Sequence, residues 1–444
     1  MVMMLRTTAM AALFTIALVG SVSAATRSDT MAEGVMQGFP PPADKQVNRG
    51  NAMTMPYMRW TFRHTRERAP TAGLRHSDTP LPLPEGTALD LDKVTFRAGK
   101  ETLSVAEYLQ RTFTDGFMVL HRGHVVAQGY YDGLDYHDTH IWASMTKSVT
   151  GLLAGFFIEE GRLDPRAKLS RYVPELEGTP FGEATLQQNL DMEVAVSYPE
   201  KMPPDLGLFA AVGVVPRRDG MPDNIYDFLR VPSQTEGVDK VWFYQNGSAE
   251  AVAWAIRKVA DERWSELVSQ RIWSRFADDD AYILVDRLMT EMASGGMNAT
   301  LSDTARFAES VRRALSLTEP RTAFDRAVQR VLAPRDNRDL FATGNFAKAR
   351  PGYAYHNFWY HRNDANGGLE CAGRFGQKIY IDPKRELVVV KLASTPDTAR
   401  RATRAGTSAG AIQRARWTPA RCSTPWWMPW ETNSRTEKII RNDF

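Results

Sequence analysis

The sequence predicts an α/β (α+β) protein in which an antiparallel sheet is flanked by helices, with a mostly helical subdomain inserted between its first and last strands. Residues 117–131 have the pattern of two strands around the turn Arg122-Gly123, and residues 371–392 that of two strands joined by a turn at 382–385. Most helix-period patterns lie between these strands, from about residue 150 to 320. One large domain is therefore expected over residues 96–395.

The two ends of the chain differ from this domain. Arg6, the apolar run 9–19 and the small residues that end at Ala24 predict a signal peptide over 1–24, and hence a secreted or periplasmic protein. The apolar run is too short to span a membrane. Residues 25–95 are rich in proline, arginine and polar residues and are expected to form an irregular extension. Residues 396–444 are expected to form an irregular tail, whose order the pattern leaves open.

Composition and net charge indicate which classes of binding partner to expect. The chain has 444 residues, of which 43% are hydrophobic and 24% charged, with a net charge of +3. This balance is typical of a soluble globular protein and does not indicate nucleic acid as a partner. No stable membrane insertion is expected after signal cleavage. The two cysteines, Cys371 and Cys422, are expected to be free thiols, and the oligomeric state is not predicted.

The motif Ser144-Met145-Thr146-Lys147 opens an apolar run over 148–161 that has the pattern of a buried helix. A serine and a lysine three residues apart share one helix face. Burial lowers the pKa of an amine, so Lys147 is a candidate base for Ser144. Free N–H groups at the helix start favour negative charge that develops near Ser144. The plainer alternative is a capping serine followed by a solvated lysine.

A second motif, Tyr244-Gln245-Asn246, precedes a helix pattern at 249–256, with Ser248 as a candidate N-cap. Both polar side chains of a Tyr-x-Asn loop can project into one cleft. Tyrosine acts as a base only when a nearby cation lowers its pKa, and Lys147 is the candidate cation. The alternative is an ordinary capping loop with a half-buried tyrosine.

These two motifs and the segment 371–392, in this order and spacing, resemble the serine β-lactamase and penicillin-recognising family. Segments 36–42 and 295–307 make the chain similar to the branch that includes class C-like esterases and 6-aminohexanoate-dimer hydrolases. The resemblance covers roughly 36–395. It implies a β-lactamase/transpeptidase-like fold, acylation of Ser144 and no cofactor or metal.

The resemblance also implies roles for individual residues. Lys147 and Tyr244 would transfer the proton, and Asn246 would orient Lys147 and the substrate. The backbone N–H groups of Ser144 and Arg374, next to Gly373, would form an oxyanion hole. Two further residues are candidates for the cleft: Tyr198, at a position where relatives line it, and Trp359. For both residues, ordinary packing is an equal alternative.

One position departs from the family pattern. The third motif is often Lys-Thr-Gly, whereas the matching residues here are Cys371-Ala372-Gly373. The absent lysine would pair with the carboxylate of a β-lactam or peptide. We therefore expect penicillins to be poor substrates, although the Arg374 side chain could supply a positive charge from the neighbouring position.

The leading hypothesis is a secreted serine hydrolase that acts on a small-molecule ester or amide. The alternatives are a β-lactamase or peptidoglycan peptidase on the same fold, and a non-catalytic binding protein. A G-x-S-x-G motif around Ser408 lacks the strand, the helix and the downstream histidine of an α/β-hydrolase site. The pairs His121/His124 and His137/His140 lack a third metal ligand nearby in the sequence.

Overall fold

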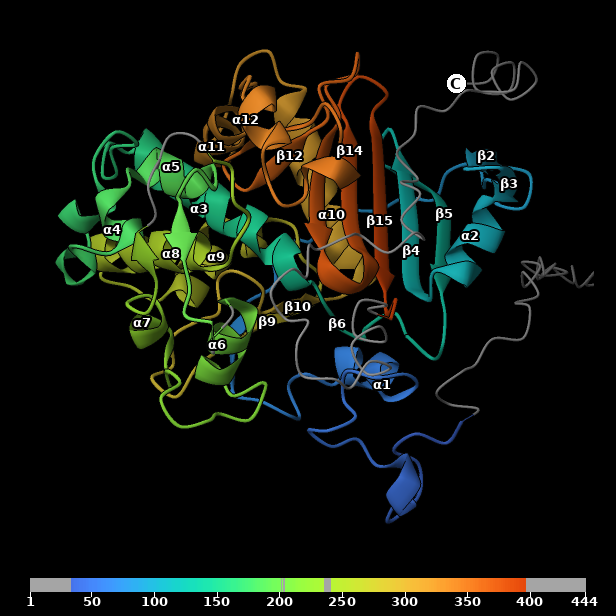
Figure 1. The fold of residues 1–444 in the computed structure, drawn as a ribbon. Coiled ribbons are helices and arrows are strands. Elements are labelled where there is room, and N and C mark those ends of the chain that lie inside the picture. Colours follow the sequence, from blue (N-terminus) through green and yellow to red (C-terminus); the bar gives the residue numbers. More distant parts are fainter. Residues whose placement is uncertain (1–32, 201, 203, 235–240, 397–444) are drawn as a thin grey trace, which may run out of the picture.

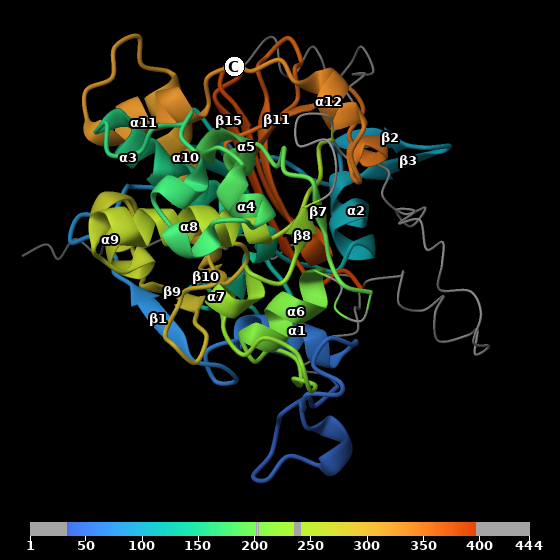
Figure 2. The same ribbon diagram turned by 60° about the vertical axis from the view of Figure 1, so that its left-hand side comes forward.

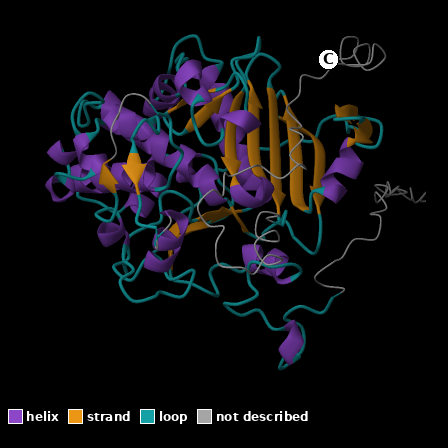
Figure 3. Ribbon diagram, in the orientation of Figure 1, coloured by secondary structure: helices purple, strands orange, loops and turns teal. Residues whose placement is uncertain are grey.

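A computed structural model of the protein describes residues 33–200, 202, 204–234 and 241–396. A seven-stranded antiparallel sheet stands beside a group of helices (Figures 1 and 3). In spatial order its strands are β11 (Ala354–His356), β12 (Trp359–His361), β13 (Leu369–Gly373), β14 (Gln377–Asp382), β15 (Leu387–Ala393), β4 (Thr114–His121) and β5 (His124–Tyr130).

The first and last parts of the domain meet at the centre of this sheet. β15 pairs with β4 over the length of both strands, and β4 forms a hairpin with β5. The hairpin turn is Arg122-Gly123, with φ angles of 53° and 81°, which confirms the predicted turn. β14 and β15 confirm the predicted turn at 382–385. The sequence predicts a single strand before this turn, from residue 371. The structure has two strands there, β13 and β14, because the 3-10 turn η7 (Arg374–Gly376) separates them.

Helices cover both faces of the sheet. Alternate residues of β4 point to opposite faces. Met118 and Leu120 belong to the large core, which lies under α10 (Leu301–Leu315), whereas Phe117 and Val119 belong to a small core under α2 (Val105–Arg111). The large core also contains the apolar faces of α3 (Thr146–Glu159) and α11 (Ala323–Val331), which pack against each other.

α3 is buried over most of its length, as its apolar run predicts. Gly151 explains how closely it packs: a Cβ at this position would collide with the carbonyl oxygen of Asn357. A helix that presents no side chain there can approach the neighbouring backbone.

Residues 150–320 contain most of the remaining helices, together with four short strands (Figure 2). The helices are α4 (Pro180–Glu183), α5 (Leu186–Leu190), α6 (Pro204–Ala211), α7 (Ile225–Phe228), α8 (Gly247–Ala260) and α9 (Trp264–Arg271). The strands are β7 (Val196–Ser197), β8 (Ser233–Gln234), β9 (Ala281–Leu284) and β10 (Met297–Ala299). After this region come α12 (Arg338–Ala342) and η6 (Ala347–Ala349); the other 3-10 turns include η3 (Leu169–Arg171), η4 (Pro174–Leu176) and η5 (Trp273–Arg275).

The described part of the N-terminal extension, from residue 33, is more regular than expected. It contains η1 (Ala43–Lys45), α1 (Tyr57–Arg63) and β1 (Thr71–Leu74). β1 pairs with β9, which is more than two hundred residues away, in a four-stranded sheet of order β1-β9-β10-β6, where β6 is His140–Ile141. Such a short strand depends on its distant partner, so the local sequence gives little sign that it is a strand. A further hairpin pairs β2 (Thr95–Ala98) with β3 (Glu101–Ser104).

Several expectations concern residues that the structure does not describe. The signal peptide over 1–24, the tail from 397 to 444 with Cys422, and the Ser408 motif all lie outside the described residues. Within the described part of the chain, no helix combines the length and the apolar character needed to cross a bilayer.

Candidate active site

Ser144 lies in the 3-10 turn η2 (Ala143–Met145), directly before α3, and is half-buried. The preceding residue, Ala143, has a φ of 47°, a left-handed conformation that is uncommon for alanine. Its carbonyl oxygen accepts a hydrogen bond from the Thr146 hydroxyl at 2.7 Å, which helps to hold the turn. Strained backbone of this kind persists where the surroundings fix it, and it is concentrated at functional sites.

Lys147 points from α3 to Ser144. Its side chain is almost fully buried, and Nζ lies 3.1 Å from Ser144 Oγ. Nζ also donates hydrogen bonds to Asn246 Oδ1 at 2.6 Å and to the carbonyl oxygen of Ser294 at 2.7 Å. A neutral amine has two N–H donors and one lone pair. With both donors occupied, the lone pair is available for the proton of the Ser144 hydroxyl.

The environment of Lys147 favours this neutral form. Burial lowers the pKa of Lys147 to about 7, despite the opposing influence of the Glu250 and Asp205 carboxylates. An amine with this pKa is partly deprotonated at neutral pH and is suited to accept and return a proton.

Tyr244 faces the same pair of residues. Its hydroxyl is hydrogen-bonded to Ser144, and its ring centroid is 5.0 Å from Lys147 Nζ. Burial raises the pKa of Tyr244, and this effect outweighs the lowering effect of the hydrogen bond with Ser144. The lowered pKa required for a tyrosine base is therefore not found; in this pair, the lowered pKa belongs to Lys147. Tyr244 is better suited to donate or relay a proton than to remove one.

Asn246 holds Lys147 from the start of α8. Its side-chain oxygen accepts the hydrogen bond from Lys147, and its Nδ2 donates to Asp205 Oδ1 at 3.1 Å. The expected N-cap was Ser248, but α8 begins one residue before it, at Gly247. The side chain of Gln245 instead accepts a hydrogen bond from the Ser248 N–H at 3.1 Å.

Glu250, which the sequence analysis did not identify, positions the second acceptor of Lys147. Its carboxylate is fully buried in α8 and accepts hydrogen bonds from the N–H groups of Ser294 and Ala293, at 2.9 and 3.2 Å. These bonds hold the backbone just before the Ser294 carbonyl that accepts the hydrogen bond from Lys147. The only sequence signal was an acidic residue within an apolar helix pattern, which indicates a buried, bonded carboxylate.

Gly373 brings the end of β13 against the nucleophile turn. A Cβ at this position would collide with the carbonyl oxygen of Trp142, so the two backbones can approach only because residue 373 is glycine. Arg374 follows at the start of η7. Its guanidinium lies 3.7 Å from the carboxylate of Asp205, a residue of α6 that was also not predicted. The positive charge considered for β-lactam binding therefore has a carboxylate beside it.

The remaining candidates lie in different surroundings. Tyr198 follows β7, is half-buried and stacks on Phe228 with ring centroids 5.9 Å apart. Its buried hydroxyl has no hydrogen-bond partner among the described residues. Trp359 is wrong as a cleft residue: it is fully buried, and its indole N–H donates to the Ser148 carbonyl behind α3. Cys371 is also buried, and burial raises the pKa of its thiol.

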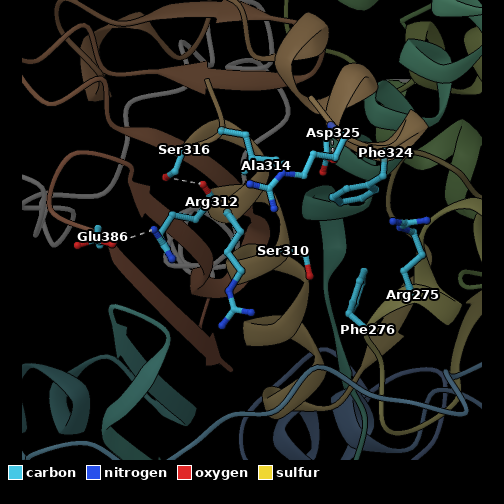
Figure 4. Close-up of a pocket in the computed structure, with 12 residues that line it drawn as sticks. Arg275, Phe276, Ser310, Arg312, Ala314, Ser316, Phe324, Asp325 and Glu386 are labelled. Carbon is cyan, nitrogen blue, oxygen red and sulfur yellow. Dashed lines mark hydrogen bonds and ion pairs between the residues drawn. The ribbon is translucent and has the colours of Figure 1, made fainter. Parts of the chain in front are cut away.

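A pocket elsewhere on the molecule is lined by none of these candidate residues. This pocket, of about 450 Å³, lies beside the C-terminal half of α10 and the start of α11. Its lining includes Arg275, Arg312, Asp325 and Glu386 (Figure 4). It is separate from the candidate site. Among the residues that the structure describes, no group of three or more His, Cys, Asp and Glu side chains is arranged to hold a metal ion.

Comparison with known proteins identifies the family. Residues 104–413 match the family model described as Beta-lactamase. The chain belongs to the beta-lactamase family. It is 30% identical over 347 residues to the 6-aminohexanoate-dimer hydrolase of Paenarthrobacter ureafaciens, a match that covers 77% of this chain and 86% of that protein.

A solved structure from this family supports the same assignment. A Bacillus anthracis protein provisionally named a 6-aminohexanoate-dimer hydrolase superposes with a TM-score of 0.72 at 30% identity, over 82% of this chain and 96% of the other. These comparisons confirm the predicted β-lactamase/transpeptidase fold. They show that the protein is a serine hydrolase of the beta-lactamase family, related to 6-aminohexanoate-dimer hydrolase.

Proposed function

We propose that the protein cleaves a linear ester or amide bond in a small molecule through an acyl-enzyme on Ser144. The observation that carries this proposal is the hydrogen bonding of Lys147. Two oxygen acceptors occupy its N–H donors, and its third position faces Ser144 Oγ at 3.1 Å. The relatives named as 6-aminohexanoate-dimer hydrolases support a linear amide as the substrate.

In the first half-reaction, Ser144 Oγ attacks the substrate carbonyl carbon while Lys147 takes the hydroxyl proton. The carbonyl oxygen, now negatively charged, is stabilised by the N–H groups of Ser144 and Arg374. Tyr244 then delivers a proton to the leaving nitrogen or oxygen, and it is reprotonated from Lys147. The bond to the leaving group breaks, and the acyl group remains on Ser144.

In the second half-reaction, water attacks the acyl-enzyme. Lys147 and Tyr244 remove the water proton and return it to Ser144 Oγ, which releases the acid and restores the site. Asn246 keeps Lys147 in place in both steps. Each role follows from one geometric feature, namely that the side chains of Lys147 and Tyr244 both contact Ser144.

A substrate panel tests this proposal. Turnover of a linear dimer of 6-aminohexanoate and of p-nitrophenyl butyrate should exceed turnover of a chromogenic cephalosporin. A fluorophosphonate probe should label the wild-type protein and should not label Ser144→Ala. Efficient cephalosporin hydrolysis without ester or amide turnover would contradict the proposed substrate class, and equal labelling of both proteins would contradict the proposed nucleophile.

We also propose that the protein is exported, because Arg6, the apolar run 9–19 and Ala24 have the order of a cleavable signal. N-terminal sequencing of the mature protein from a bacterial host should begin at Ala25. A mature protein that retains residues 1–24 in the cytoplasm would contradict this localisation.

A further inference from the structure

We propose that Arg350 is an anion-binding group of the substrate cleft, which recognises a carboxylate on the leaving-group part of the substrate. This inference rests on the proposed function and names a substrate class for the same site. It depends on three features of Arg350: its place beside Tyr244, its position over an aromatic ring, and the lack of a partner for its charge.

The segment that ends at Arg350 is fixed to the loop of Tyr244. The Tyr244 N–H donates to Asn345 Oδ1 at 3.0 Å, and Asn345 Nδ2 donates to the Tyr244 carbonyl at 3.1 Å. The ring of Phe346 meets the Tyr244 ring edge to face, with centroids 5.2 Å apart. These contacts make the segment 345–350 a wall beside the reacting tyrosine.

The Arg350 guanidinium stands over an aromatic ring next to Tyr244. Its Cζ atom lies 4.2 Å from the centroid of the Tyr360 ring, which is in turn stacked on Tyr244 with centroids 6.5 Å apart. The charge of Arg350 acts on the Tyr244 phenol, since it is among the influences that oppose the effect of burial there. Stacking of this kind fixes the plane of a guanidinium and leaves its N–H edge available.

This charge has no partner among the described residues. Arg350 Nε is buried without a hydrogen bond, and none of the ion pairs of the described chain involves Arg350. Glu370 is close enough to act on Arg350 electrostatically, but its carboxylate already accepts hydrogen bonds from Lys378 Nζ at 2.5 Å and from the Tyr353 hydroxyl at 2.8 Å. A half-buried cation without a partner is costly, and a bound anion would relieve that cost.

The chemistry of the group and its place specify the ligand. A planar guanidinium matches a carboxylate with two parallel hydrogen bonds. Tyr244 is the residue proposed to protonate the leaving atom, so a cation beside Tyr244 faces the leaving-group part of the substrate. The oxyanion at Ser144 is proposed to be held by backbone N–H groups and does not require Arg350.

Kinetics on matched substrates test the inference. The pair is a linear amide with a carboxylate on its amine portion and the methyl ester of that carboxylate, with p-nitrophenyl butyrate as a neutral reference. In Arg350→Gln, the KM for the anionic amide should rise about tenfold to a hundredfold, the scale of a charged hydrogen bond. The KM for the methyl ester and for the aryl ester should change far less than the KM for the anionic amide. Arg350→Lys should retain part of the preference, and Lys348→Gln, which removes an exposed cation two residues away, should retain all of it.

Binding separates this inference from the proposed function. In a Ser144→Ala background, the dissociation constant of the anionic amide, measured by calorimetry, should rise by the same factor on adding Arg350→Gln. An unchanged dissociation constant would overturn the role of Arg350 even if the enzyme hydrolyses amides. Equal losses for the neutral and anionic substrates would also overturn it, because they would indicate a structural role for Arg350.

Discussion

Lys147 Nζ lies 3.1 Å from Ser144 Oγ, and two oxygen acceptors on other elements hold it there. The acceptors are Asn246, the residue before α8, and the Ser294 carbonyl in the loop before β10, so the base is fixed by parts of the chain that are far apart in sequence. The elements that hold the amine also bury it, and this burial lowers the pKa of Lys147.

The pH dependence of catalysis should report the protonation state of Lys147. Burial lowers the pKa of Lys147 to about 7, and only the neutral amine can accept the Ser144 proton. The kcat/KM for a neutral ester, measured from pH 5 to 9, should therefore rise with pH and reach half its maximum near pH 7. Asp205→Asn removes a charge that raises this pKa, so its midpoint should lie lower than that of the wild type. A profile that is flat or falls between pH 6 and 8 would contradict Lys147 as the base.

Lys147 and Tyr244 should act as one unit. Both contact Ser144, so the loss of either residue interrupts the same proton transfer. Lys147→Ala and Tyr244→Phe should each lower kcat/KM by about a hundredfold or more, on the scale of general acid–base contributions. The double variant should lose little beyond either single variant. Strictly additive losses in the double-mutant cycle would argue for separate roles.

Burial of Lys147 should also appear in stability. Folding lowers its pKa from 10.5 to about 7, so between these pH values the unfolded chain binds more protons than the folded one. The free energy of unfolding should therefore rise with pH across this window, and the penalty at lower pH should be on the order of a few kcal/mol.

Lys147→Met removes the titrating group at similar volume. Chemical denaturation at pH 6, 8 and 10 should give Lys147→Met a higher free energy of unfolding than the wild type at pH 6. This difference should become smaller towards pH 10. The difference between the two proteins isolates Lys147 from other titrating groups. A margin that does not vary with pH would show that the amine is not desolvated in the folded protein.

Penicillins should be poor substrates. Cys371 occupies the position of a lysine that often pairs with the β-lactam carboxylate, and the Arg374 guanidinium lies near Asp205. A missing charge-assisted hydrogen bond weakens binding by about tenfold to a hundredfold. The kcat/KM for benzylpenicillin should accordingly fall well below that for p-nitrophenyl butyrate. Because Cys371 is buried, Cys371→Lys would place a charge in the core, so the informative comparison is between substrates on the wild type.

Local patterns predicted the elements that carry the site. An apolar run with a serine and lysine at helical spacing was sufficient to place α3, and a hairpin turn to place β4 and β5. The β-lactamase fold followed from the order of three such elements, and the family match confirms it. Each of these elements is encoded by residues that are close together in the sequence, which is the range over which periodicity is informative.

Features that depend on distant partners could not be predicted. β1 forms a strand because β9 pairs with it, and Trp359 is buried because α3 covers it. Asp205 lies on α6 beside Arg374, and Arg350 lies after α12 over the ring of Tyr360, and neither residue lies in a motif. Burial, rather than the nearby cation, decides the pKa of Tyr244, and the sequence alone does not show how deeply that side chain is buried.

The most direct test of this account is the position of the covalent adduct. The protein would be trapped with a slow ester or a phosphonate, digested and analysed by peptide mass spectrometry, with Ser144→Ala as the control. The account predicts added mass on the peptide that contains Ser144 in the wild type and no adduct in the variant. An adduct on Ser408, retained when Ser144 is replaced, would contradict it.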